Sequence, residues 1–291
     1  DVDMVSDGWT EIIRNLTGIV AKHASKRLGR RLTKAERAHL MELSDYKKMN
    51  QIRARVEEIV NDPETAEALK PWYRQFCKRP CFHDEYLQTY NRDNVTLVDT
   101  QGKGVERLTE KGVIVDGKEY EVDCLIFATG FEVATSYTRR AGYDIIGKHG
   151  KTLSSHWENG LRTLHGLHSN GFPNCFFLGF TQSGQTVNAP HALDEQAKHL
   201  AYILDESRAR GASTVEASAE AEQQYVEEIH RLASLGRRFY SECTPGYYNG
   251  EGTSGNKGGF FSNMYGGGPT RFFKLLESWR SDGGLRGLEL N

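Results

Sequence analysis

Long apolar runs are missing from the 291-residue sequence: none approaches the roughly 20 residues that a membrane-spanning helix needs. The opening residues, DVDMVSDGW, contain no apolar core of a signal peptide. An excess of one charge is missing as well, because 37 basic and 39 acidic residues are well mixed and leave a net charge of -2. We therefore expect neither a membrane nor a nucleic acid as a partner.

Cysteine is scarce, with five residues in the whole chain. Cys124 in DCLIFA and Cys175 in NCFFLG lie inside apolar runs. For these two residues the pattern favours reduced thiols in a core over disulfides. Reduced thiols are typical of a reducing compartment, so we predict a cytoplasmic location.

A glycine-rich phosphate loop in a fitting context is also missing. Residues 124–131, CLIFATGF, predict a buried parallel strand that stops at a glycine turn, as strands do beside a bound dinucleotide. The one literal Gly-x-Gly-x-x-Gly is Gly250, Gly252 and Gly255, between CTPGYYN and NKGGFF. Neither a strand before it nor a helix after it is indicated, so we interpret it as a surface loop. The sequence therefore indicates late strands of a dinucleotide-binding sheet without the opening unit, in a divergent fold or in part of a larger enzyme.

Helical periodicity dominates the first ~75 residues. A helix is predicted over 8–28, and a second one after Thr33, which forms a capping box with Glu36. Asp62 and Pro63 predict the start of a short third helix. From residue 76 the pattern becomes β-rich, with predicted strands in NVTLVDT, GVIV and YEVDCLIFAT and later in NCFFLGF.

The second half of the chain adds three predicted helices. One covers 191–210 and ends at Gly211, and one covers 219–235 and ends at Gly236. The third lies near TRFFKLLESWR in an otherwise glycine-rich and aromatic tail. The chain therefore combines helices with short strands and belongs to the α/β class.

Several segments together strongly resemble the C-terminal half of flavin-dependent Baeyer–Villiger monooxygenases, closest to the phenylacetone, steroid and cyclopentadecanone type. The resemblance lies in the Lys-Arg step before YNRDNV, in Ala-Thr-Gly-Phe, in Gly-Phe-Pro-Asn and in HALDEQAKHLAYI. Both Rossmann glycine fingerprints and the family signature Phe-x-Gly-x-x-x-His-x-x-x-Trp are absent from these residues. The resemblance implies an α/β fold: the C-terminal part of a flavoprotein monooxygenase with two dinucleotide-binding domains, for FAD and NADPH.

The same resemblance implies a division of the chain into four parts. Residues 1–75 would be a helical segment of the NADPH domain, and 76–135 the terminal β-rich part of that domain. Residues 136–240 would be the returning part of the FAD domain, and 241–291 a Gly-rich C-terminal loop and helix. The FAD-binding Rossmann motif would then come from an N-terminal half, on the same or a separate chain.

The function that the resemblance implies is insertion of one oxygen atom from O2 next to a ketone carbonyl. The product is an ester or lactone, formed through a peroxyflavin, with FAD and NADPH as cofactors. Two alternatives remain: an N- or S-oxygenating flavin monooxygenase, and a truncated non-catalytic scaffold or partner chain. A flavin disulfide reductase is disfavoured, because Cys77 and Cys81 have the wrong spacing for a Cys-x-x-Cys pair.

Two basic residues match cofactor-facing positions of the family. Arg79 matches the arginine beside the flavin, where a permanent cation stabilises a peroxide anion and the charge on the ketone oxygen. Lys78 matches the lysine that meets the 2'-phosphate of NADPH. Without the resemblance, both would be interpreted as solvated surface side chains.

Two backbone positions match sites near the cofactors. Thr129 and Gly130 end the strand in CLIFATGF, where a glycine permits close approach of a cofactor or simply forms a turn. Asn188, Ala189 and Pro190 begin a helix that faces the flavin in the family, and their N–H groups suit electron-rich oxygens. Pro190 also suits an early helical position without any function.

Two further groups of positions are implied. The residues just before this helix correspond to positions that line the ketone pocket: Gln185, Thr186 and Val187. A mobile loop of the family that folds over the nicotinamide corresponds to Tyr247, Tyr248 and Asn249, with Tyr247 in place of a Trp. Without the resemblance, this second group would be a glycine-rich loop.

Three other patterns carry no functional prediction. Cys77 and Cys81 beside His83 give too few ligands for a metal site, and the basic residues between them repel a cation. His165 and His168 are interpreted as structural. Ser183 in TQSGQ lacks the full Gly-x-Ser-x-Gly elbow of a hydrolase.

Overall fold

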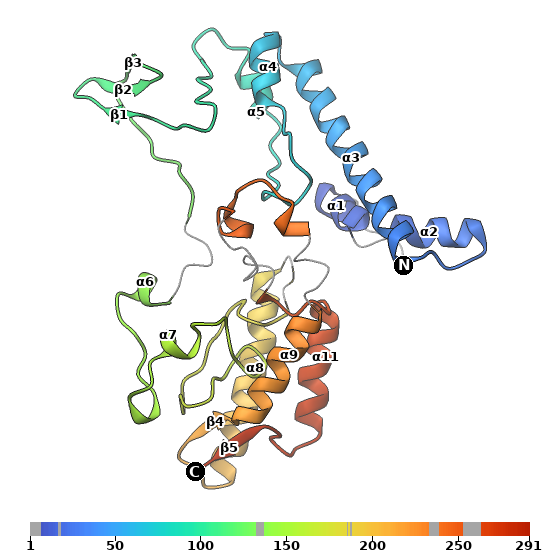
Figure 1. Cartoon of the computed structure of the whole chain (residues 1–291), viewed down its shortest axis with the longest axis vertical. Helices are drawn as coiled ribbons and strands as arrows, with labels where there is room; N and C mark the ends of the chain where they lie inside the picture. The colour runs from blue at the N-terminus through green and yellow to red at the C-terminus, as the bar shows by residue number, and fades with distance from the viewer. Residues whose placement is uncertain are drawn as a thin grey trace. The chain divides into compact units, whose positions relative to one another are not determined.

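The computed structural model describes residues 7–16, 19–131, 137–184, 186, 188–232, 239–252 and 263–291 (Figure 1). The chain divides into two compact units, residues 1–131 and 132–291. The finer division into four parts stays a prediction. Within the described ranges, no helix is long and apolar enough to cross a membrane.

The first unit is mainly helical, as the periodicity predicts. Its helices are α1 (Gly8–Leu16), α2 (Ile19–Leu28), α3 (Lys34–Ile59), α4 (Pro63–Leu69) and α5 (Tyr86–Thr89). The predicted capping box of α3 is confirmed: Thr33 Oγ1 accepts from the N–H of Glu36, whose carboxylate accepts from the N–H of Thr33. Asp62 caps α4 ahead of Pro63, also as predicted. A small core joins α3 and α4 through Val56, Val60 and Ala66.

A three-stranded antiparallel sheet follows, in the order β1 (Arg107–Leu108), β2 (Gly112–Val115) and β3 (Lys118–Glu121). The turn between β2 and β3 contains Asp116 and Gly117, at φ values of 51° and 74°. Positive φ at both central residues is the geometry that suits the right-handed twist of a tight hairpin. The strand predicted in GVIV is therefore confirmed as β2.

The long strand predicted over residues 120–129 is wrong for this chain. Only Tyr120 and Glu121 pair, within β3, and residues 122–131 form no strand. Their large side chains are exposed, with 82% of Ile126, 71% of Phe127 and 94% of Phe131 accessible to solvent. The segments NVTLVDT and NCFFLGF form no strand either. The reason is that a strand needs a neighbouring strand along its edge, and the described residues form none beside these segments; only single bonds are made, such as that from the N–H of Phe177 to the carbonyl of Leu167.

The second unit is built on three long helices: α8 (Ala189–Ala209), α9 (Ala219–Leu232) and α11 (Pro269–Ser281). Figure 1 shows them alongside one another. The predicted end of α8 is confirmed, because Gly211 follows its C-cap with φ of 72°. The predicted continuation of α9 to residue 235 and its stop at Gly236 lie outside the described residues. The helix predicted near TRFFKLLESWR is confirmed as α11.

Shorter elements surround these helices. They are α6 (Tyr137–Ala141), the 3-10 turns η1 (Lys148–Gly150) and η2 (Tyr247–Asn249), and α7 (Leu153–His156). Strands β4 (Val215–Ala217) and β5 (Leu288–Leu290) pair antiparallel and bring the C-terminal residues to the segment between α8 and α9. Most of residues 157–188 is irregular.

Aromatic and aliphatic side chains from these elements form the core of the second unit. The largest cluster joins α9 to α11 and consists of Leu164, Ala217, Tyr225, Ile229, Tyr265, Phe272 and Leu276. A second cluster lies under α8 around Leu167, Ile203 and Val215. Cys175 is a half-buried free thiol whose pKa is raised by burial, whereas Cys124 is a free thiol but exposed. The expectation of a core thiol is therefore wrong for Cys124 in this chain.

Candidate functional site

The segment that carries Lys78 and Arg79 is irregular, and a buried carboxylate of α3 fixes its start. Asp45 is only 1% exposed. Its carboxylate accepts from Nε of Arg74 at 2.6 Å and from the backbone N–H of Gln75 at 2.9 Å. Because both oxygens are used, the backbone just before the two basic residues is tied to the longest helix of the first unit.

The side chains of Lys78 and Arg79 are exposed but lie over aromatic rings. The guanidinium carbon of Arg79 is 5.8 Å from the ring centroid of Trp9 in α1. The ammonium of Lys78 is 5.9 Å from the ring of Tyr73. Trp9 in turn packs edge to face against Phe82 at 5.5 Å. Such rings support the stems of cations whose charged ends still face water. The geometry is compatible with contact to an anionic ligand, and the roles of both residues stay predictions.

Thr129 and Gly130 lie in the exposed segment 122–131. Gly130 has φ of 89°, and among the described residues no atom beyond its chain neighbours lies within 4 Å of the place where a Cβ would stand. The positive φ accounts for a glycine at this position, because side chains other than glycine rarely adopt it. Their predicted proximity to a cofactor therefore stays a prediction.

The start of α8 is a capped helix terminus. Asn188 Oδ1 accepts from the N–H of His191 at 3.2 Å, and Asn188 N–H donates to Thr186 Oγ1 at 2.9 Å. Pro190 has no N–H, so within the described part of the chain Ala189 carries the first-turn donor that has no acceptor. A free N–H at the positive end of a 21-residue helix suits an electron-rich oxygen of a bound ring.

Of the predicted pocket residues, only Thr186 is described, while Gln185 and Val187 lie outside the described residues. Thr186 is half-buried and borders a surface groove of about 690 Å³ between α8 and α11. The groove is lined mainly by charged and polar side chains, among them His191, Glu195, Lys198, Lys274, Glu277 and Arg280. Among the predicted site residues, a hydrogen bond joins Asn188 to Thr186, and Lys78 and Arg79 are neighbours in the chain.

One acidic cluster in this groove has the spacing of metal ligands. The ligand atoms of His191, Asp194 and Glu195 lie within 4.8 Å of one another. Lys198 already pairs with Asp194 at 2.7 Å and with Glu195 at 3.0 Å. The Lys198 ammonium pairs with both carboxylates, and the Arg280 guanidinium lies 4.0 Å from Glu195, so the cluster gives no support for a cation site.

The predicted cofactor-facing loop is organised by its own asparagine. Asn249 is buried, and its Oδ1 accepts from the N–H groups of Gly246 at 3.0 Å and Gly252 at 3.1 Å. Its Nδ2 lies within 3.3 Å of three carbonyl oxygens, those of Tyr240, Cys243 and Thr244. The ring of Tyr248 is buried and lies 4.3 Å from the ring of Tyr247. In this arrangement the Asn249 side chain bonds its own loop, and contact of the three residues with a cofactor stays a prediction.

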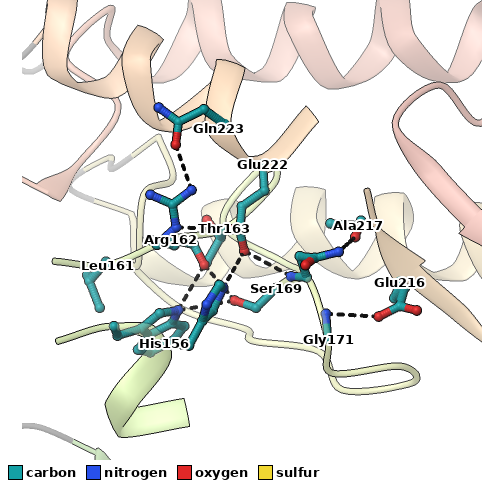
Figure 2. Close-up of polar contacts among 12 residues, drawn as sticks. His156, Leu161, Arg162, Thr163, Ser169, Gly171, Glu216, Ala217, Glu222 and Gln223 are labelled. Atoms are coloured by element: carbon teal, nitrogen blue, oxygen red, sulfur yellow. Dashed lines mark hydrogen bonds and ion pairs between the residues drawn. The ribbon is translucent and has the colours of Figure 1, made fainter. Parts of the chain in front are cut away.

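The sequence analysis missed a buried carboxylate on α9 that Figure 2 shows at the centre of a polar network. Glu222 accepts from His156 Nε2 at 2.9 Å, from Arg162 Nε at 3.2 Å and from the N–H of Asn170 at 2.9 Å. Burial alone would raise the pKa of Glu222, but the bonds from His156 and Asn170 and the positive charges outweigh it and hold the pKa below its usual value. Its partners occupy its oxygens, so we interpret Glu222 as structural.

A second buried carboxylate fixes the neighbouring residues. Glu216 in β4 accepts from the N–H of Gly171 at 2.9 Å and pairs with the ammonium of Lys148. The Asn170 amide donates to the carbonyl of Ala217 at 2.9 Å. The two carboxylates together hold the irregular segment that leads from α7 towards α8. No sequence signal identified them, because glutamates in strands and first helical turns are normally solvated.

Three buried histidines form a group: His199 belongs to α8, and His165 and His168 come from the irregular segment before it. Burial lowers the pKa of His168 to about 4, and burial together with the neighbouring His168 lowers the pKa of His165 to about 3. Burial, His165, the Arg280 charge and His168 lower the pKa of His199 to about 2. His165 Nδ1 lies 3.2 Å from His199 Nε2, whereas neither ring nitrogen of His168 has a partner within the described residues. The arrangement agrees with the structural interpretation of His165 and His168.

Comparison with solved structures supports the predicted fold class, one part of a flavoprotein with two dinucleotide-binding domains. No family model matches the chain. It is 52% identical over its full length to neopentalenolactone D synthase of Streptomyces avermitilis, of which it covers 48%. It is 42% identical over 99% of its length to the Baeyer–Villiger monooxygenase ATR8 of Stachybotrys chlorohalonatus, of which it covers 46%.

Solved structures agree with these relatives. A polycyclic ketone monooxygenase from Thermothelomyces thermophila matches the whole chain with a TM-score of 0.83 and 36% identity, over 47% of that protein. A cyclohexanone monooxygenase from Rhodococcus sp. Phi1 bound to NADP+ matches 86% of the chain with a TM-score of 0.73 and 28% identity, over 45% of that protein. The resemblance to the C-terminal half of Baeyer–Villiger monooxygenases is therefore confirmed in both sequence and fold. The chain spans about half the length of the curated relatives it matches.

Removal of the Asp45 carboxylate is expected to destabilise the segment that carries Arg79. Asp45→Ala removes the carboxylate that accepts from the Arg74 guanidinium and from the Gln75 N–H. Because these groups are partly or fully buried, we expect a loss of about 2–3 kcal/mol in the free energy of unfolding, measured by denaturant titration of the full-length protein. The control Asp93→Ala at an exposed position should cost less than about 0.5 kcal/mol. Equal losses in the two variants would contradict the anchoring role.

Acid should destabilise the second unit through its buried histidines. Their folded pKa values lie below the ordinary value of 6.5, so the unfolded chain binds more protons below that pH. The contribution of these histidines to the free energy of unfolding is therefore fully present above about pH 6.5. It falls towards pH 4.5, by at most about 1.4 kcal/mol per pH unit for each histidine. Glu222 adds its own loss only below its unfolded pKa of 4.5, as its carboxylate becomes protonated.

His168→Leu tests this pH dependence. It removes two buried nitrogens without partners, so stability at pH 7.5 should be unchanged or higher, and the loss between pH 6.5 and 4.5 should be smaller. Thermal unfolding midpoints across this pH range measure both effects. His39→Leu on the exposed face of α3 is the control and should keep the original pH slope. An unchanged slope in His168→Leu would show that His168 does not contribute.

Proposed function

We propose that this chain is part of an FAD- and NADPH-dependent Baeyer–Villiger monooxygenase. The enzyme inserts one oxygen atom from O2 next to a ketone carbonyl and releases an ester or lactone. The observation that carries the proposal is the match to such enzymes along the whole chain, in both sequence and fold. A cytoplasmic location is part of the same proposal.

The names of the relatives support a cyclic ketone as the class of substrate. Two of the solved structures are a polycyclic ketone monooxygenase and a cyclohexanone monooxygenase, and one relative is named for a lactone. Oxygen insertion beside the carbonyl of a ring ketone produces a lactone. We therefore propose a ring ketone as substrate and a lactone as product.

FAD, when bound, supplies the oxygen-activating chemistry, and NADPH supplies the electrons. The described residues fit a part of these cofactors rather than the whole. Within the described ranges no glycine loop lies between a strand and a helix, so the pyrophosphate cradle belongs to the missing N-terminal half. The residues that fit are the exposed cations of the first unit and the free N–H at the start of α8.

Each predicted residue has a role that its geometry permits. Arg79 holds negative charge beside the reacting ketone, and Lys78 meets the 2'-phosphate of NADPH. Ala189 donates its N–H to an electron-rich oxygen of the flavin ring, while Asn188 and Pro190 fix the helix start.

The remaining residues let a cofactor approach the backbone, contact the ketone or cover the nicotinamide. Thr129 and Gly130 allow the backbone to approach a cofactor closely. Thr186 lies on the ketone side together with Gln185 and Val187. The loop with Tyr247, Tyr248 and Asn249 covers the nicotinamide and excludes water.

The partner of this chain is the N-terminal half of the enzyme, which binds the exposed segment 122–131. Five apolar residues of this segment are exposed: Val122, Leu125, Ile126, Phe127 and Phe131. A run of this composition is typical of a parallel strand buried on both faces. Because the chain spans about half the length of its relatives, we propose that the missing half supplies the neighbouring strands.

Arg79→Ala in the full-length enzyme tests the catalytic role. Loss of the cation should lower the rate of ester formation about 100-fold or more, with a smaller loss of NADPH oxidation, because the charge next to the ketone oxygen is no longer stabilised. Arg79→Lys keeps the positive charge but loses the planar guanidinium, so its rate of ester formation should lie between those of the wild type and of Arg79→Ala. Ester formation is measured by product analysis, and NADPH oxidation by absorbance.

Arg92→Ala at an exposed position is the control and should leave both rates unchanged. A full-length enzyme that oxidises amines or sulfides but no ketone would favour the N- or S-oxygenating alternative. A full-length protein that does not bind FAD would favour a non-catalytic partner chain. Wild-type rates in Arg79→Ala would reject the assigned residue while leaving the reaction in place.

Phe127→Ala in the full-length enzyme tests the docking of the N-terminal half. The side chain is 71% exposed in this chain, so on its own contacts the change should cost less than about 0.5 kcal/mol. If the N-terminal half buries it, the cost should be about 3 kcal/mol in denaturant unfolding. Leu28→Ala on α2, 54% exposed and outside any predicted strand, is the comparison and should cost less than about 1 kcal/mol. Similar small costs for both residues would contradict the docking proposal.

A further inference from the structure

Residues 179–184, which we call the platform, come directly before the predicted pocket residues 185–187 and the helix cap Asn188. The platform has no helix or strand of its own. Its backbone is nevertheless held by buried side chains from other parts of the second unit, at both ends and in the middle. This inference rests on the proposed function, because it concerns the ketone pocket that the function assigns to residues 185–187.

Gln196 holds the first residue of the platform. It is buried on α8, and its Oε1 accepts from the N–H of Gly179 at 2.9 Å while its Nε2 donates to the carbonyl of Gly179 at 2.6 Å. Ser183 Oγ donates to the same carbonyl at 2.8 Å. One amide side chain therefore occupies both backbone groups of Gly179 and ties the start of the platform to α8, the helix that begins just after it.

Gln182 holds the middle of the platform. Its Oε1 accepts from Thr163 Oγ1 at 2.5 Å, and its Nε2 donates to the carbonyl of Leu161 at 2.8 Å. Its backbone N–H donates to the carbonyl of Asn263 at 2.9 Å, and its carbonyl accepts from Tyr225 Oη at 2.7 Å. Four contacts from four different residues fix a single buried side chain and its peptide groups.

The end of the platform lies directly against α11. A Cβ on Gly184 would stand 2.6 Å from Cβ of Phe272, which is fully buried. The carbonyl of Ser183 accepts from the N–H of Tyr265 at 3.0 Å. The chain thus leaves a fully held position at Gly184 and enters the predicted pocket one residue later.

Buried amides are a costly way to hold an irregular segment, because each loses its water and must find other hydrogen-bond partners. Apolar packing would stabilise a loop without fixing the direction of its peptide groups. Hydrogen bonds to both peptide groups of Gly179 and of Gln182 do fix that direction. The arrangement is therefore suited to precise placement of Thr186 and Asn188, the described residues that follow the platform.

We propose that Gln182, Gln196 and Tyr225 are positioning residues that set the orientation of the ketone. They act through the platform on residues 185–188 and do not touch the substrate themselves. If the pocket segment were displaced, an unsymmetrical ring ketone could bind in two orientations. Either of the two carbons bonded to its carbonyl carbon could then migrate to oxygen. The platform thereby controls which of the two lactones forms and how much NADPH is consumed without product.

Three substitutions in the full-length enzyme test this proposal: Tyr225→Phe, Gln196→Met and Gln182→Met. Tyr225→Phe keeps the ring in its core and removes only the hydroxyl that donates to the Gln182 carbonyl. The two Met variants keep side-chain length and remove the amide bonds. Each variant should change the ratio of the two lactones, and lower the product formed per NADPH, by roughly five- to tenfold.

The matched controls make the same chemical changes elsewhere. Gln224→Met removes an exposed amide on α9 that bonds only Glu220 in the described structure, and Tyr202→Phe changes a half-buried ring on α8. Both should keep the wild-type lactone ratio. A merely structural role would lower the unfolding midpoint and kcat of the platform variants but leave the lactone ratio and the product per NADPH unchanged, and that result would overturn the proposal.

Two further outcomes separate this proposal from the proposed function. If the wild-type enzyme forms no ester from any ketone, the proposed function fails. Hydrogen exchange then tests separately whether Gln196 holds the platform. Gln196→Met should speed amide exchange at residues 179–188 at least fivefold relative to Gln224→Met, because Gly179 loses its two hydrogen bonds to the Gln196 side chain. An unchanged exchange rate would contradict the proposal that Gln196 holds the platform. If Gln182→Met does not fold, Tyr225→Phe and Gln196→Met decide the question.

Discussion

Irregular backbone in this chain depends on buried polar side chains to satisfy its peptide groups. Helices and strands bond their own N–H and carbonyl groups, but the candidate site residues lie mostly on segments that have neither. Asp45 performs this role beside Lys78 and Arg79, and Gln182 and Gln196 perform it before the α8 cap. Asn249 performs it for its own loop. In each case one side chain replaces the neighbouring strand that a sheet would provide.

These side chains are costly to bury and hold direction rather than add stability. A carboxylate such as Glu222 keeps its charge only because His156, Arg162 and a backbone N–H surround it. The benefit is that the irregular residues 157–184, between α7 and α8, have defined peptide orientations. A site in which a ketone and two cofactors must meet requires such definition more than it requires a deep apolar core.

Local sequence signals predicted the helices well and the sheet poorly. The capping box at Thr33 and the Asp62-Pro63 start involve residues only three positions apart, so the whole signal is present in the chain. The strand at residues 120–129 requires a neighbouring strand, which the described residues do not form beside it, and the prediction was therefore wrong. The buried role of Glu222 was invisible because a glutamate in the first turn of a helix is normally solvated. Arg79 entered the candidate site through resemblance alone, since composition and spacing give it only a surface role.

The same constraint explains why one segment remains exposed while others are held. A side chain can satisfy the two peptide groups of one residue, as Gln196 does for Gly179. It cannot satisfy a run of ten residues, and no side chain can cover the apolar faces at Ile126 and Phe127 at the same time. Such a run needs a strand along each edge and helices on each face. In the proposed function, residues 122–131 are therefore the segment that pairs with backbone from outside this chain, whereas side chains of the chain itself hold the platform and the Arg79 segment.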